Sequence, residues 1–70
     1  MNKMKLPQIG ETWTHFKGGK YLIKGFAWEA DGPHLVLRVI YCSEEAIFTR
    51  TLSNFLEPID GTPRFQHDQT

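Results

Sequence analysis

The sequence predicts a small all-β domain, a partly open barrel of about five short strands with one helical turn before the last strand. Short segments rich in threonine and aromatic residues alternate with tight-turn signals along the 70 residues. Within these segments the apolar residues recur at every second position, which is the period of a strand. Only residues 52–55 depart from that period and resemble one turn of helix.

We expect one domain at residues 11–65, with a flexible N-terminal arm at 1–10 and a frayed C-terminal tail at 66–70. The first strand is predicted over Glu11 to Phe16. The Lys17-Gly18-Gly19 segment then turns the chain, because glycine admits the positive φ of tight hairpin turns. This hairpin organises the rest of the predicted barrel.

The second strand is predicted over Lys20 to Trp28. Tyr21 and Ile23 have one parity, whereas Phe26 and Trp28 have the other. Gly25 lies between the two pairs and is a natural site for a β-bulge. A bulge there predicts that all four large side chains point to the inside.

The third strand, His34 to Cys42, is apolar on both faces. Leu35, Leu37, Val39 and Tyr41 form one face, and Val36, Arg38, Ile40 and Cys42 form the other. A strand of this kind is usually covered on both sides. We expect the second cover to come from another copy of the chain, in a homo-oligomer, because so short a chain has a thin core.

A polar turn at Ser43 to Glu45 leads to a fourth strand, Ala46 to Thr51, which is expected to pair with the third. The helical turn follows, capped by Ser53 or Asn54. The last strand is predicted at Leu56 to Ile59, where Pro58 confines it to a sheet edge. A helical turn before a final strand resembles SH3-like barrels.

Composition limits the classes of protein and cofactor. The only cysteine, Cys42, permits no intrachain disulfide, and the histidines lack the paired spacing of a zinc site. No metal or cofactor is therefore expected. No signal peptide or apolar span is recognisable, so we expect a soluble, cytoplasmic protein with no membrane partner.

The net charge is zero but unevenly placed: residues 1–24 sum to +4 and the remainder to −4. Binding to double-stranded DNA is not favoured, because such proteins are usually basic overall. The division favours one basic face for a small anion, or two faces that attract each other between subunits.

Arg38 and Arg50 are the candidate ligand-binding cations. Each shares a strand face with apolar or aromatic residues, so they could clamp a phosphate while a base stacks nearby. The alternative is a structural or subunit-bridging arginine, paired with Glu44, Glu45 or Glu57. His15 is a possible neighbour of this site, although His15 and Lys17 are also expected simply as solvated residues beside the turn.

Trp13, Trp28 and Phe48 are the candidate stacking platform. The alternative is ordinary core and interface packing, with Trp28 as the most exposed of the three. Cys42 is expected to be a buried or interface thiol, because nothing places a histidine beside it. Without a nucleophile, base or metal constellation, we expect no enzyme.

The chain also resembles the small bacterial and phage family known as domain of unknown function 1653. The similarity runs from about Gly10 to Phe65. It rests on four blocks, which are Trp13 to Gly18, Phe48 to Arg50, Phe55 to Glu57, and Pro63 to Phe65, and on the single residues Tyr21, Arg38 and Tyr41. The family usually has tryptophan at Phe48, proline at Thr51, glycine at Cys42 and tyrosine at Leu37. The resemblance implies a compact β fold and brings no catalytic residues.

Two functions follow as hypotheses. The first is a non-enzymatic module, a homo-oligomer that binds a small anion such as a nucleotide, as a phage sponge for an immune signal would. The second is an SH3-like accessory domain that binds a peptide or single-stranded nucleic acid.

Overall fold

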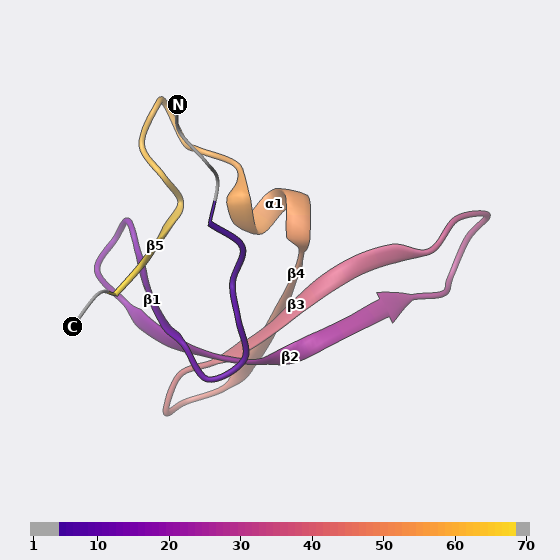
Figure 1. Ribbon diagram of the computed structural model, residues 1–70, viewed down its shortest axis with the longest axis horizontal. Helices are drawn as coiled ribbons and strands as arrows, with labels where there is room; N and C mark the ends of the chain where they lie inside the picture. The colour runs from indigo at the N-terminus through magenta and orange to yellow at the C-terminus, as the bar shows by residue number, and fades with distance from the viewer. Residues whose placement is uncertain (1–4, 69–70) are drawn as a thin grey trace.

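The computed structural model describes residues 5–68 and shows a nearly all-β domain (Figure 1). Its elements are β1 (Thr12–His15), β2 (Lys20–Glu29), β3 (Val36–Cys42), β4 (Ile47–Thr51), α1 (Leu52–Leu56) and β5 (Phe65–His67). The strands form one antiparallel sheet in the order β4-β3-β2-β1-β5. The predicted all-β class, with a helical turn before the last strand, is confirmed. The sheet does not close into a barrel, since β4 and β5 are its two edges.

The predicted first hairpin is confirmed. The amide of His15 donates to the carbonyl of Gly19, and the amide of Gly18 donates to the carbonyl of His15, both at 2.7 Å. Gly18 has a φ of 104°, a conformation that side chains with a Cβ rarely adopt. The two glycines therefore serve the turn.

The predicted bulge in β2 is also confirmed. The pairing with β3 shifts register between Ile23 and Gly25. Ile23 pairs with Tyr41, whereas Phe26 pairs with Val39, so the large side chains on both sides of the bulge share a face. That face is buried at Ile23 but exposed at Phe26 and Trp28.

The expectation that all four side chains lie inside is therefore wrong. Phe26 and Trp28 are exposed because β2 and β3 continue together beyond the rest of the domain as a projecting ladder, called the arm here (residues 26–37; Figure 1). Phe26 and Trp28 lie on the predicted face of the sheet, but no other part of the described chain covers the end of the ladder. Trp28 is 62% exposed there.

The core lies between the inner face of the sheet and α1. Its buried members are Trp13, Ile23, Val39, Tyr41, Phe55 and Phe65. Phe55 of α1 stacks on Phe65 of β5 with ring centres 4.2 Å apart, and Trp13 meets the edge of Phe55 at 5.3 Å. Aromatic rings supply much of the buried area that a short chain needs.

The end of the chain differs from the prediction in two ways. Thr51, rather than Ser53 or Asn54, caps α1, because the cap precedes the first helical residue and its hydroxyl accepts the Asn54 amide at 3.1 Å. The last strand is β5, not Leu56 to Ile59. Helix α1 takes Leu56, and Pro58 has no amide to donate to a ladder.

Both segments flanking the core strands are bonded to the sheet. Pro7 is fully buried, and the amide of Gly10 donates to the carbonyl of Ile23 at 2.9 Å. Gln66 belongs to β5, and the Asp68 carboxylate accepts from Lys20 at 2.7 Å. Residues 66–68 are therefore bonded to the sheet, within the tail that the sequence predicts to fray; residues 1–4 of the predicted N-terminal segment and residues 69–70 of the tail lie outside the described range.

Within residues 5–68, no helix is long and apolar enough to cross a membrane.

Candidate functional site

A shallow hollow of about 550 Å³ follows the edge strand β4. It is called the β4 hollow here and is lined by Arg38, Tyr41, Phe48, Thr49, Arg50, Thr51 and Asn54. Two candidate cations and one candidate stacking residue from the sequence therefore line the same hollow. The volume falls in the range of small-molecule sites.

Arg50 is held firmly in the β4 hollow. Its Nε donates to the Tyr41 hydroxyl at 2.8 Å, and its Nη1 donates to Asn54 Oδ1 at 2.6 Å. The guanidinium carbon lies 5.7 Å from the ring centre of Phe65, at cation–π distance. Nη2 has no hydrogen-bond partner among residues 5–68, so this orientation leaves it available to an anion.

Arg38 reaches the β4 hollow from the other face of the sheet. In the ladder Arg38 pairs with Thr51 and Val39 pairs with Arg50, so the two arginines point to opposite sides. Arg38 donates to Glu29 Oε1 at 2.6 Å and to Thr49 Oγ1 at 3.1 Å. The two arginines therefore do not approach a ligand from one face of the sheet.

Within one chain, neither arginine pairs with the predicted carboxylates Glu44, Glu45 and Glu57. Arg38 pairs with Glu29 across the β2–β3 ladder, where register brings the two strands together. Arg50 has neutral partners, and Glu57 lies 3.6 Å from Arg64 instead.

Phe48 is the exposed aromatic group beside Arg50. Its ring stacks on Tyr41 with centres 5.6 Å apart, and the ring of Tyr21 is perpendicular to it with centres 5.8 Å apart. Phe48 remains 39% exposed, so part of the ring is free for a ligand. Trp13 is buried in the core with its Nε1 donating to Glu11, and Trp28 lies on the arm. The three predicted aromatic residues therefore form no single platform.

His15 is half-buried rather than simply solvated. Its ring lies against Phe16 at 4.6 Å and Phe65 at 4.9 Å, and Nδ1 accepts the Lys17 amide at 3.2 Å. Burial lowers the pKa of His15, and the positive charges of Arg50, Arg64 and Lys17 lower it further. Lys17 itself is exposed, as expected.

Sequence reasoning missed three residues around this site: Tyr41, Asn54 and Arg64. Tyr41 and Asn54 orient Arg50. Arg64 precedes β5, its Nε is buried, and that nitrogen has no partner among residues 5–68. A signal for Arg64 was present in the Pro63-Arg64-Phe65 block, which was used only as a family marker.

Residues 11–67 match the model of a family described as a protein of unknown function, DUF1653. The chain belongs to the DUF1653 family. The predicted resemblance is confirmed, and it covers all five strands and α1. No curated protein and no solved structure matches the chain.

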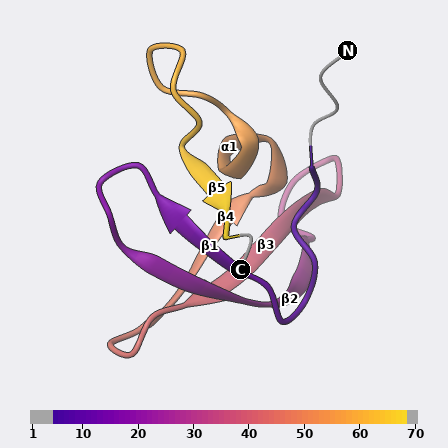
Figure 2. The same ribbon diagram turned by 60° about the vertical axis from the view of Figure 1, so that its left-hand side comes forward.

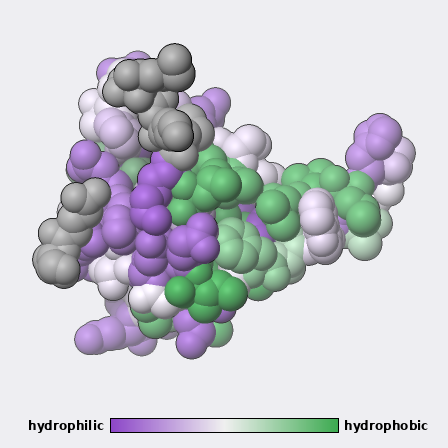
Figure 3. Space-filling model, in the orientation of Figure 1, coloured by the Kyte–Doolittle hydropathy of each residue, from purple (hydrophilic) through white to green (hydrophobic). Residues whose placement is uncertain are grey.

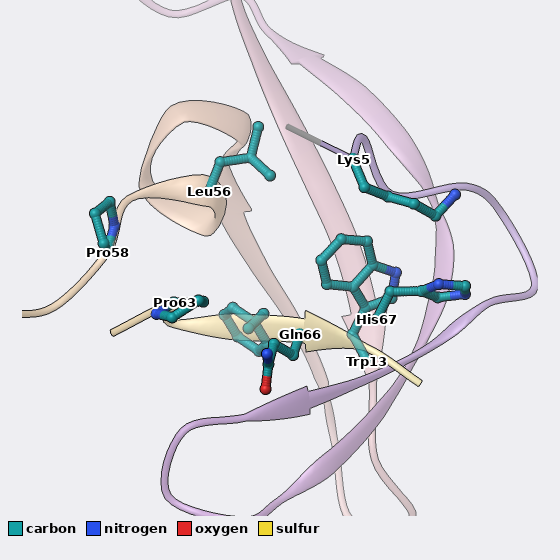
Figure 4. Close-up of a pocket in the computed structure, with 8 residues that line it drawn as sticks. Lys5, Trp13, Leu56, Pro58, Pro63, Gln66 and His67 are labelled. Carbon is teal, nitrogen blue, oxygen red and sulfur yellow. The ribbon is translucent and has the colours of Figure 1, made fainter. Parts of the chain in front are cut away.

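A second hollow of this DUF1653 protein, about 380 Å³, lies between β5 and α1 (Figure 4). It is lined by Lys5, Trp13, Leu56, Pro58, Pro63, Phe65, Gln66 and His67. Its cations are already engaged: Glu11 accepts from Lys5 at 2.8 Å and lies 3.3 Å from His67 Nε2. The Lys5 contact is the main reason that the pKa of Glu11 falls to about 2. An anion therefore finds less free charge here than at Arg50.

Within residues 5–68, no three histidine, cysteine, aspartate or glutamate side chains lie together as metal ligands would. Cys42 is a free, half-buried thiol on the outer face of β3.

Proposed function

We propose that this DUF1653 protein is a non-enzymatic binding module that holds a small anionic ligand, such as a nucleotide, as a homo-oligomer. The observation that supports this most is the pairing of Arg50 with Phe48 in the β4 hollow. Arg50 has an oriented, free Nη2, and Phe48 has a partly free ring. These are the groups that bind a phosphate and stack on a base.

The arm supports the homo-oligomer. Phe26 and Trp28 carry the inner face of the sheet onto the arm, where they are exposed, and the hydrophobic surface runs outward in the same direction (Figure 3). Large exposed apolar surface usually marks an interaction site. The occupant that we propose is a second copy, with the two arms antiparallel about a two-fold axis.

Charge favours that arrangement. Asp31 lies at the tip of the arm and Lys24 near its base; both are exposed and neither has an ion-pair partner among residues 5–68. Antiparallel arms bring the tip of one over the base of the other, so these opposite charges face each other. A second subunit would also help to enclose a hollow that one short chain leaves open.

The proposed role requires binding without turnover, as in a phage-encoded sponge that sequesters an immune signal. Titration calorimetry against a panel of cyclic and linear nucleotides tests it. We expect one nucleotide class to bind and Phe48→Ala to weaken that binding about tenfold, since stacking contributes about 1–3 kcal/mol per base. Ile47→Ala, at the exposed neighbouring position of β4, is the control. Absence of binding to every nucleotide would refute the proposal.

Sedimentation equilibrium tests the subunit contact separately. We expect a dimer mass that Trp28→Ser shifts toward the monomer, whereas Ile47→Ser, at an exposed position of β4, leaves the mass unchanged. A strict monomer contradicts the homo-oligomer. Salt-dependent binding to an oligonucleotide, lost on Lys17→Ala with Lys20→Ala, would instead support the accessory-domain hypothesis.

A further inference from the structure

Positive charge gathers where the two edges of the open sheet approach each other. Arg50 of β4 lies over the ring of Phe65 of β5, and His15 of β1 lies against the same ring. Phe65 thus brings together two cationic or titratable groups from different strands. The cluster that these two residues form with Lys17 and Arg64 is called the seam here.

Helix α1 draws Arg64 to the same side. Arg50 donates to Asn54, and Arg64 lies 3.6 Å from Glu57, three residues later. Asn54 lies in α1 and Glu57 is its C-cap residue, so these two contacts place both arginines at the end of the helix. Figure 2 shows α1 beside both β5 and the end of β4. The side chain of Arg64 is mostly buried, yet its Nε lacks a partner among residues 5–68.

The charges at the seam do not balance. Among residues 5–68, the only ion pair of Lys17, Arg50 and Arg64 joins Arg64 to Glu57, which is largely exposed and too far from Arg64 for a short hydrogen bond. The backbone places Lys17 and Arg64 beside His15, because the Lys17 amide donates to His15 Nδ1 at 3.2 Å and the Phe16 amide donates to the Arg64 carbonyl at 2.9 Å. A buried, unpartnered guanidinium nitrogen amid surplus positive charge is costly unless an anion completes it.

We propose that the seam is a phosphoryl-binding subsite, in which Arg50, Arg64 and His15 contact the oxygens of one phosphoryl group and Lys17 adds charge from the turn. The donors approach from β1, β4 and the segment before β5. That arrangement suits a tetrahedral group with three terminal oxygens better than a flat carboxylate, which one arginine can bind through two parallel hydrogen bonds. As an extension of the proposed function, this subsite would hold the phosphate of a nucleotide whose base lies on Phe48.

Histidine NMR of the unmodified protein tests the subsite with inorganic phosphate and then pyrophosphate as probes. The imidazole resonances are followed through a pH titration, with chloride at matched ionic strength as the reference. We expect phosphate to move the midpoint of the His15 titration upward by about one pH unit, as a close negative charge does. His34 and His67 lie outside the seam and are the internal controls.

The subsite is overturned if the His15 titration is the same in phosphate and chloride, or if all three histidines respond alike. Arg64→Gln and Lys17→Ala should each weaken phosphate binding, by about tenfold for Arg64. Lys5→Ala, which removes a lysine outside the seam, should not. Since Lys17 is exposed, its variant tests the subsite even if Arg64→Gln does not fold.

The outcomes separate the two proposals. If a nucleotide binds and His15 does not respond, the seam inference fails and the proposed function stands. If phosphate moves His15 but no nucleotide binds, the seam stands and the nucleotide proposal fails.

Discussion

Replacing Arg50 by lysine is expected to destabilise the fold without changing its charge. The guanidinium joins β4 to β3 through the Tyr41 hydroxyl and to α1 through Asn54, at 2.8 and 2.6 Å. A lysine ammonium cannot make both bonds with the same directions. Hydrogen bonds to charged groups contribute roughly 1.5–3 kcal/mol each, and partial exposure favours the lower end. Allowing for one bond that lysine retains, we expect a loss of about 2 kcal/mol.

That loss is large for this domain. A 70-residue domain has a free energy of unfolding of roughly 4–10 kcal/mol. A loss of about 2 kcal/mol should lower Tm by about 8–16 °C. Urea unfolding followed by circular dichroism gives the free energy, and a thermal scan gives Tm.

Arg38→Lys is the matched control. Arg38 pairs with Glu29, whose side chain is 41% exposed, and lysine can keep that ion pair. Exposed ion pairs contribute about 0–1 kcal/mol, so the control should cost little. If the two variants differ by less than about 0.5 kcal/mol, Arg50 is not the tie between α1 and the sheet that its geometry indicates.

Three further predictions test other features of the fold. Phe55→Ala should cost about 3–5 kcal/mol because it empties the stack on Phe65, and the cooperative unfolding transition in circular dichroism should be nearly lost. Glu11→Gln should be less stable than the parent at pH 7. Because the folded pKa of Glu11 is lowered to about 2, the parent's advantage is complete above the usual pKa of 4.5 and should vanish as pH falls toward 2, which urea titrations at several pH values measure. Gly18→Ala should cost about 1–2 kcal/mol because its φ is 104°, whereas Gly25→Ala, whose added Cβ meets nothing within 4 Å, should cost less in the same unfolding assay.

Local patterns predicted the elements whose signals are local. The Lys17-Gly18-Gly19 turn and the Gly25 bulge each follow from glycine placed between alternating runs, and both are present. The β2 and β3 strands follow from side-chain period alone. Burial did not follow, because period shows which face a side chain takes and not whether anything covers that face. Trp28 lies on the predicted face of β2, but at a position where the ladder extends beyond the rest of the domain.

The last strand shows the limit of local signals more clearly. Strand β5 has only three residues, and it forms because Phe65 pairs with His15, about fifty residues earlier in the chain. The three residues of β5 alone carry no sequence pattern that predicts this pairing. The segment Leu56 to Ile59 has the better local strand pattern but contains the end of α1 and a proline. Tertiary pairing, and not local strand propensity, therefore determines which segment forms the last strand.

The separation of Arg38 from Arg50 depends on the length of one turn. A three-residue turn, Ser43 to Glu45, would pair Cys42 with Ala46 and hence Arg38 with Arg50, on one face. In the structure the Ser43 amide donates to the Ala46 carbonyl, and Cys42 pairs with Ile47. One added residue moves every side chain of β4 to the opposite face relative to β3. The added residue places Arg50 on the inner face, toward Tyr41, Phe65 and the seam, and leaves Arg38 on the outer face with Glu29. Which arginine belongs to the candidate site therefore depends on the length of this turn. The polar residues 43–46 do not specify that length.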